Sequence, residues 1–196
     1  MDAGSWRRNA NVPNALTLLR IFMVPVFLWL LLAEGGQNDG LRWWAAGVFA
    51  GAAATDRLDG YLARRNGTVT TFGIVADPIA DKALTGSGFV ALSALGLLPW
   101  WVTVLVLGRE IGVTALRAAV IRHTVVPASK GGKLKTVLQT VALTALVAPL
   151  PPALTAIGYV IMAAAVVVTV VTGVQYAVAI LGAARRHRAG VGRDQA

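Results

Sequence analysis

Four aspartates within a short stretch of the chain are of the residue type that holds divalent cations. Asp56 and Asp59 are three residues apart, and Asp77 and Asp81 are four residues apart. Either spacing places the two side chains of a pair on one face of a helix. Two facing helices would then gather four carboxylates, and hard cations such as Mg²⁺ bind oxygen ligands of this kind together with substrate phosphates.

The residues beside these aspartates leave space for a ligand. Gly60 and Ala63 add little side chain to the acidic face, so a ligand can approach the backbone there. Arg64 follows at the same end and is suited to bind a phosphate through two N–H groups. The alternative is a solvated acidic helix end, with salt bridges to Arg57, Arg64 and Lys82. Neighbouring apolar spans favour the functional interpretation, because ionisable residues beside such spans are costly and are usually functional.

The composition predicts an all-α polytopic membrane protein with a single domain, residues 1–196. The chain is 56% hydrophobic and only 14% charged, which is unusual for a soluble domain. Apolar runs of roughly 18 to 25 residues recur, and each is long enough to cross ~30 Å of hydrocarbon. The chain has no cysteine, which excludes disulfides, thiolate catalysis and cysteine-ligated zinc. The net charge of +9 is attributed to cytoplasmic loops and anionic lipid, not to nucleic acid.

Six transmembrane helices are expected, and they position the aspartates at helix ends. The expected ranges are 15–34, 41–64, 72–97, 100–122, 134–149 and 153–182. A short interfacial segment, residues 1–13, would precede them, and a basic tail, residues 185–196, is expected to be mobile at its end. The stretches 65–71 and 123–135 are interpreted as loops, the second with glycines and lysines suited to an anion.

The distribution of basic residues predicts which side of the membrane the aspartates occupy. With six spans, both termini lie on one side, together with the acidic stretch and the 123–135 loop. The three opposite turns, near 35–42, 97–101 and 149–153, contain only Arg42 among the 18 lysines and arginines. Cytoplasmic loops carry the excess of positive charge. We therefore expect a bacterial inner (plasma) membrane protein with its termini and active site in the cytoplasm.

The acidic stretch completes a longer pattern, D-x2-D-G-x2-A-R-x8-G-x3-D-x3-D, which resembles the signature of the CDP-alcohol phosphatidyltransferases. The resemblance implies that Asp56, Asp59 and Asp77 bind one or two Mg²⁺ (or Mn²⁺) ions. It implies that Asp81 is the general base and also contacts a metal. It further implies that four residues contact the lipid-linked nucleotide, CDP-diacylglycerol: Gly60, Ala63, Arg64 and Gly73.

Three shorter motifs resemble the phosphatidylglycerophosphate synthase branch of that family. They are P-N-x-L-T-x2-R from Pro13 to Arg20, the pair Arg109-Glu110, and G-K-x-K-T-x2-Q from Gly132 to Gln139. This branch implies sn-glycerol 3-phosphate as the acceptor, phosphatidylglycerophosphate and CMP as products, and a homodimer. The phosphate of the acceptor needs cations, and the available ones are Arg109, Arg117, Lys133 and Lys135. The alternatives are inositol phosphate or phosphatidylglycerol as acceptor and, in a different class of protein, a cation transporter.

Several polar residues within the spans have two interpretations. Arg20 either extends to the interface as an anchor or faces the bundle interior and binds an anion, which we favour. Asn14 or Thr17 is a candidate to satisfy free backbone donors at the first helix start, near Pro13. Arg109 and Glu110 form either a structural pair or part of a basic cavity wall.

Overall fold

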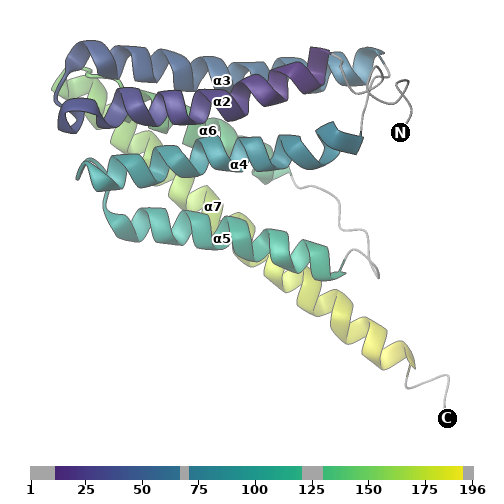
Figure 1. The fold of residues 1–196 in the computed structure, drawn as a ribbon. Helices are drawn as coiled ribbons and strands as arrows, with labels where there is room; N and C mark the ends of the chain where they lie inside the picture. Colours follow the sequence, from purple (N-terminus) through teal and green to yellow (C-terminus); the bar gives the residue numbers. More distant parts are fainter. Residues whose placement is uncertain (1–11, 67–70, 121–129, 192–196) are drawn as a thin grey trace.

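A computed structural model describes the backbone of residues 12–66, 71–120 and 130–191, and the side chains of residues 15–55, 76–116 and 132–180. Within these ranges the chain forms six α-helices and one short 3-10 helix, η1 (Figure 1). Their bounds are α2 Val12–Leu32, η1 Ala33–Gly36, α3 Asp39–Asn66, α4 Thr71–Ala94, α5 Trp100–Val120, α6 Lys130–Val147 and α7 Pro152–Val191. The all-α prediction is confirmed for the described residues. The interfacial segment predicted at residues 1–13 lies outside them, apart from the first two residues of α2.

Six helices occur where six apolar runs were predicted, but two boundaries were wrong. α6 begins at Lys130, so the stretch 130–135 is helical and not part of a loop. Its glycines lie in the first turn, where their low helix propensity is offset by packing of α6 against α7 and α3. α7 continues to Val191, through the run Arg185–Arg188 that was assigned to the tail. Alanine and arginine favour helix, and basic residues near a helix C-terminus interact favourably with its dipole.

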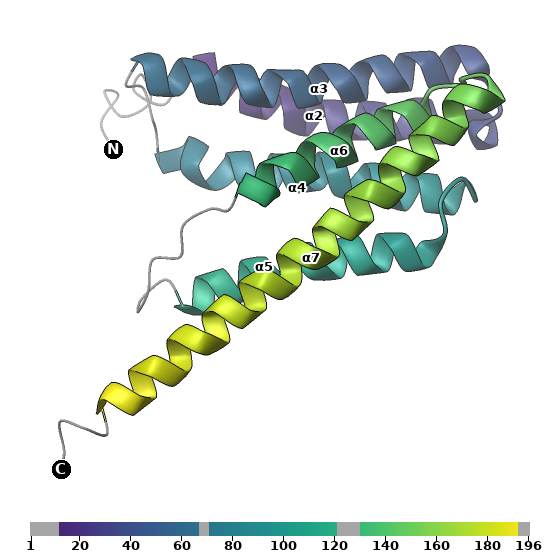
Figure 2. The same ribbon diagram turned by 180° about the vertical axis from the view of Figure 1, so that it is seen from behind.

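The core of the bundle is a continuous apolar cluster between the helices. Phe27 of α2 and Phe49 of α3 pack with their ring centroids 5.2 Å apart. α4 contributes Phe89 and Leu92, and Leu143 of α6 lies fully buried beside them. α7 crosses α6 and then α5 obliquely (Figure 2), and it contacts both. This crossing brings the middle of α7 against polar residues of α5 and α6.

Three short connections lie together at one end of the bundle, on the left in Figure 1: α2–α3, α4–α5 and α6–α7. In the first, Asn38 caps α3 by accepting a hydrogen bond from the Leu41 N–H at 3.1 Å. Gly36 has φ +72°, and a Cβ there would lie 2.8 Å from Leu95 Cδ1, so only glycine fits this turn. The C-terminal end of α3 and the N-terminal end of α4 lie at the opposite end of the bundle, on the right.

The outer faces of the helices are strongly apolar. Among the described residues, two helical segments are long and apolar enough to cross a membrane, Ala15–Gly36 and Pro152–Ile180, and only 22% of each is buried inside the protein. Large side chains such as Phe22, Trp44 and Val160 are about two-thirds exposed. An apolar surface of this extent is consistent with a membrane protein whose helices face lipid. α7 has 40 residues, or about 60 Å at ~1.5 Å per residue, which is longer than a bilayer core is thick.

Candidate active site

A cavity of about 500 Å³ opens where four helices meet, and we call it the charged cavity. Six charged side chains line it, four of them cationic and two acidic, which leaves a formal charge of +2. An anionic ligand is therefore favoured there. The charged residues are Asp81 and Lys82 of α4, Arg109 and Glu110 of α5, and Lys133 and Lys135 of α6. The polar residues Thr114, Thr172 and Tyr176 also line it.

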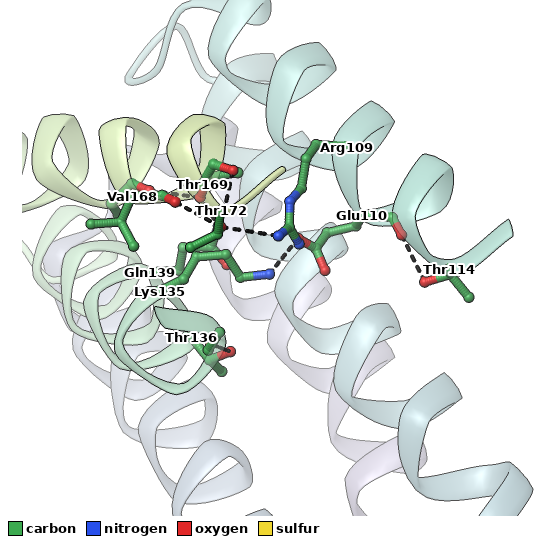
Figure 3. Close-up of polar contacts among 11 residues, drawn as sticks. Arg109, Glu110, Thr114, Lys135, Thr136, Gln139, Val168, Thr169 and Thr172 are labelled. Carbon is green, nitrogen blue, oxygen red and sulfur yellow. Dashed lines mark hydrogen bonds and ion pairs between the residues drawn. The ribbon is translucent and has the colours of Figure 1, made fainter. Parts of the chain in front are cut away.

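Glu110 joins two cations on the wall of the charged cavity (Figure 3). Its carboxylate accepts a hydrogen bond from Arg109 Nη1 at 3.0 Å, and Lys135 Nζ donates to the same oxygen, Oε1. Lys135 is buried, and it lines the charged cavity together with Asp81. Because two cations share one carboxylate, one positive charge at this wall remains available to an anion.

The two proposed roles of the Arg109-Glu110 pair are both visible in this arrangement. The pair links α5 to α6 through Lys135, which is the structural role. It also lines the charged cavity, as the functional interpretation required. A partly buried ion pair contributes little net stability after desolvation, so its position beside the cavity is the more informative observation.

An apolar compartment of about 240 Å³ adjoins the charged cavity between α4, α5 and α6. The two spaces share four lining residues: Asp81, Lys82, Glu110 and Lys135. Beyond them four apolar or small residues and three polar ones line the compartment: Gly86, Val106, Leu107 and Ile111, and Thr85, Thr136 and Gln139. A ligand with both a phosphate and an apolar part would therefore find matching surroundings on the two sides of Asp81.

The structure describes the side chains of one aspartate pair, Asp77 and Asp81, and only the backbone of the other, Asp56 and Asp59. Asp77 accepts a hydrogen bond from the Thr17 hydroxyl of α2, which fixes the orientation of that carboxylate. Asp56 and Asp59 lie on the last turns of α3, at the same end of the bundle as the start of α4, but their side chains lie outside the described residues. Within the described side chains no group of three or more potential metal ligands is found. The four-aspartate metal site stays a prediction.

Arg20 and Thr17 both face the bundle interior. Arg20 is completely buried, and its Nε donates to the carbonyl oxygen of Ala52 at 3.3 Å. The interpretation of Arg20 as an interfacial anchor was therefore wrong, because the α2–α3 packing encloses its side chain. Thr17 lies in the second turn of α2, whose first residue is Val12. Its hydroxyl donates to Asp77 and does not cap the helix, so that possible role was wrong.

The structure brings together four of the residues predicted to act on the acceptor. Asp81, the predicted base, lines one cavity with Arg109, Lys133 and Lys135, the predicted phosphate ligands. The surroundings of six other predicted site residues lie outside the described side-chain ranges: Asn14, Gly60, Ala63, Arg64, Gly73 and Arg117. Sequence reasoning missed Thr172 and Tyr176 of α7. The signal was present, because Thr169, Thr172 and Tyr176 recur at helical spacing in an otherwise apolar run.

The chain belongs to the CDP-alcohol phosphatidyltransferase family, whose sequence model matches residues 10–171. It is 57% identical over 169 residues to a Mycobacterium tuberculosis protein named "Probable phosphatidylglycerophosphate synthase", covering 86% of this chain and 81% of the relative. It is 36% identical over 146 residues to the Bacillus subtilis CDP-diacylglycerol--glycerol-3-phosphate 3-phosphatidyltransferase, covering 69% and 76%. A CMP-forming cardiolipin synthase of Streptomyces coelicolor is 38% identical over 119 residues, covering 59% and 54%. Membership of a transferase family replaces the cation-transporter interpretation.

Proposed function

We propose that the chain transfers the phosphatidyl group from CDP-diacylglycerol to sn-glycerol 3-phosphate, giving phosphatidylglycerophosphate and CMP. The observation that carries this proposal is the charged cavity, where a carboxylate of the family signature faces three cations suited to a phosphate. The names of the two relatives that cover most of this chain support the same reaction. The chain would thus act in phospholipid biosynthesis.

The acceptor hydroxyl is the nucleophile in this reaction. Its oxygen forms a bond to the phosphorus that carries diacylglycerol, the bond from that phosphorus to the CMP oxygen breaks, and the hydroxyl proton passes to Asp81. A carboxylate is a weak base for an alcohol, so the geometry and the neighbouring cations must assist the transfer. Lys135 lines the same cavity as Asp81. Four cations would bind the phosphate of the acceptor: Arg109, Arg117, Lys133 and Lys135.

The carboxylates of the signature fit a hard divalent cation, because they supply oxygen ligands and one of them, Asp77, is already oriented by Thr17. Asp56, Asp59, Asp77 and Asp81 would hold one or two Mg²⁺ or Mn²⁺ ions. Such ions would supply positive charge beside the diphosphate and would stabilise the leaving group. Gly60, Ala63, Arg64 and Gly73 would contact the CDP portion, and Arg20 is a further candidate for anion binding.

The proposed setting is a bacterial plasma membrane, with six spans and the aspartates on the cytoplasmic side. The apolar outer faces and the common end of the three short connections support this arrangement. Those connections contain no lysine or arginine, and Arg42 lies just beyond the first of them, in the first turn of α3, so the other basic residues gather toward the other side. The acyl chains of CDP-diacylglycerol would stay in lipid while its diphosphate reaches the aspartates.

An acceptor screen tests the reaction. Purified protein with CDP-diacylglycerol and Mg²⁺ is given sn-glycerol 3-phosphate, inositol phosphate, phosphatidylglycerol or serine, and the lipid product is identified. We expect phosphatidylglycerophosphate from the first acceptor at the highest kcat/KM. Preferred turnover of inositol phosphate or phosphatidylglycerol would replace the proposed acceptor, and CMP release with none of the four would contradict the reaction.

A further inference from the structure

Arg109 is held in the charged cavity by residues of α7, a helix outside every motif that the sequence analysis used. Its Nη2 donates to the Thr172 hydroxyl at 3.0 Å, while its Nη1 donates to Glu110 at 3.0 Å (Figure 3). The two terminal nitrogens of the guanidinium are therefore anchored by two different helices. Because the group is planar, two such anchors fix both its position and its plane.

Thr172 is well suited to act as the acceptor in this contact. Its hydroxyl donates to the Val168 carbonyl at 2.7 Å, so its single proton is turned toward the backbone of α7. The lone pairs of the oxygen are then directed at Arg109. The side chain is 6% exposed, and a β-branched residue in a helix has a restricted χ1 angle. The acceptor is thus preorganised and does not depend on the substrate.

Gly173 gives the stem of Arg109 room to lie against α7. A Cβ at residue 173 would lie 3.1 Å from Cγ and 3.3 Å from Nε of Arg109, closer than ordinary van der Waals contact. The Nε group is itself buried, without a hydrogen-bond partner among the described residues. A buried donor of this kind costs free energy, and the two bonds at the end of the side chain offset that cost.

We propose that Thr172 and Gly173 are positioning residues that direct Arg109 toward the phosphate of the acceptor. The inference rests on the proposed function and adds to it that α7 sets the affinity for the acceptor. Removing the hydroxyl leaves the guanidinium anchored only at Glu110, so the ground-state binding of the phosphate weakens. The chemical step, which involves Asp81, is affected less.

The test compares two threonines one turn apart on α7. Thr172→Val keeps the shape of the side chain and removes the acceptor oxygen, and we expect the KM for sn-glycerol 3-phosphate to rise roughly tenfold. The KM for CDP-diacylglycerol should change little. Thr172→Ser should restore acceptor affinity, and Gly173→Ala should raise the same KM because it displaces Arg109. In an Arg109→Ala background, Thr172→Val should have no further effect.

Thr169→Val is the matched control. Thr169 is fully buried, its hydroxyl donates to Ala165 O, and it accepts from Gln139 Nε2 at 3.1 Å instead of from Arg109. Loss of the Thr169 hydroxyl should lower the thermal stability of the protein without raising the acceptor KM. An active wild-type enzyme whose Thr172→Val and Gly173→Ala variants keep the wild-type acceptor KM contradicts the positioning role. A folded wild-type enzyme that makes no phosphatidylglycerophosphate contradicts the reaction itself, so the two failures are distinguishable.

Discussion

Arg42 and Arg109 are both arginines partly enclosed by an apolar helical bundle, and they use their N–H groups differently. Arg42, near the short connections, donates to the backbone carbonyls of Leu146 and Val147 at 3.0 Å each. These carbonyls belong to the last turn of α6, where no intrahelical donor is available. Arg109 donates to two side chains on the wall of the charged cavity. Arg42 thus completes the end of α6, whereas Arg109 is presented to the charged cavity.

Polar side chains near the short connections differ in their contacts from those of the charged cavity. At the end with the short connections, polar side chains complete the fold. Ser93 and Thr103 bond each other at 2.7 Å, and Tyr159 donates to the Leu97 carbonyl at 2.8 Å. In the charged cavity, cations outnumber carboxylates and face open space. Substitutions at the first end should change stability, and substitutions in the charged cavity should change catalysis.

Removal of divalent cations should have the largest effect, because the signature carboxylates are proposed to act through them. EDTA should abolish CMP release, and excess Mg²⁺ should restore it. Unfolding monitored by circular dichroism in the same buffers is the control for a general loss of structure. Turnover that persists in EDTA would contradict the metal site.

Asp81→Asn should lower kcat by roughly 10²- to 10⁴-fold, the usual contribution of a general base, while CDP-diacylglycerol still binds. The measurements are CMP release and equilibrium binding of the lipid substrate. Asp39→Asn is the matched control, because Asp39 is an exposed aspartate at the start of α3 near the short connections. Near-normal turnover by the Asp81 variant would remove it as the base.

Lys135→Ala should raise the KM for sn-glycerol 3-phosphate by roughly ten- to a hundredfold, since a charged hydrogen bond to the phosphate is lost. The KM for CDP-diacylglycerol should rise less. Lys135→Met, which keeps most of the side-chain volume, separates lost charge from the space left by truncation. If both variants keep the acceptor KM of the wild type, Lys135 does not contact the acceptor.

Arg42→Gln should have the smallest effect on catalysis. The KM for either substrate should stay unchanged, because Arg42 donates hydrogen bonds to the end of α6 and is not among the residues that line the charged cavity. The free energy of unfolding should fall by about 1–3 kcal/mol, as two buried carbonyls lose their donor. Thermal unfolding in detergent measures the loss. A raised acceptor KM in this variant would contradict a purely structural role for Arg42.

The sequence was sufficient to predict the helices, because each apolar run is bounded by glycine, proline or charged residues. It failed at the start of α6, where Gly131 and Gly132 were interpreted as loop although a first helical turn tolerates glycine. Its motifs indicated Arg109, Lys133, Lys135 and Asp81, which line one cavity in the structure, while their roles stay predictions. It did not identify Thr172, although the spacing of Thr169, Thr172 and Tyr176 places them on one helix face. That this face meets α5 depends on the oblique crossing of α7, which no local pattern encodes.

The location of bound sn-glycerol 3-phosphate is the most direct test of the charged cavity. An experimental structure of the full chain with Mg²⁺ and sn-glycerol 3-phosphate should place the phosphate against Arg109, Lys133 and Lys135, with the acceptor hydroxyl toward Asp81. A phosphate bound away from these side chains, with the charged cavity left to solvent, would contradict the proposed acceptor site.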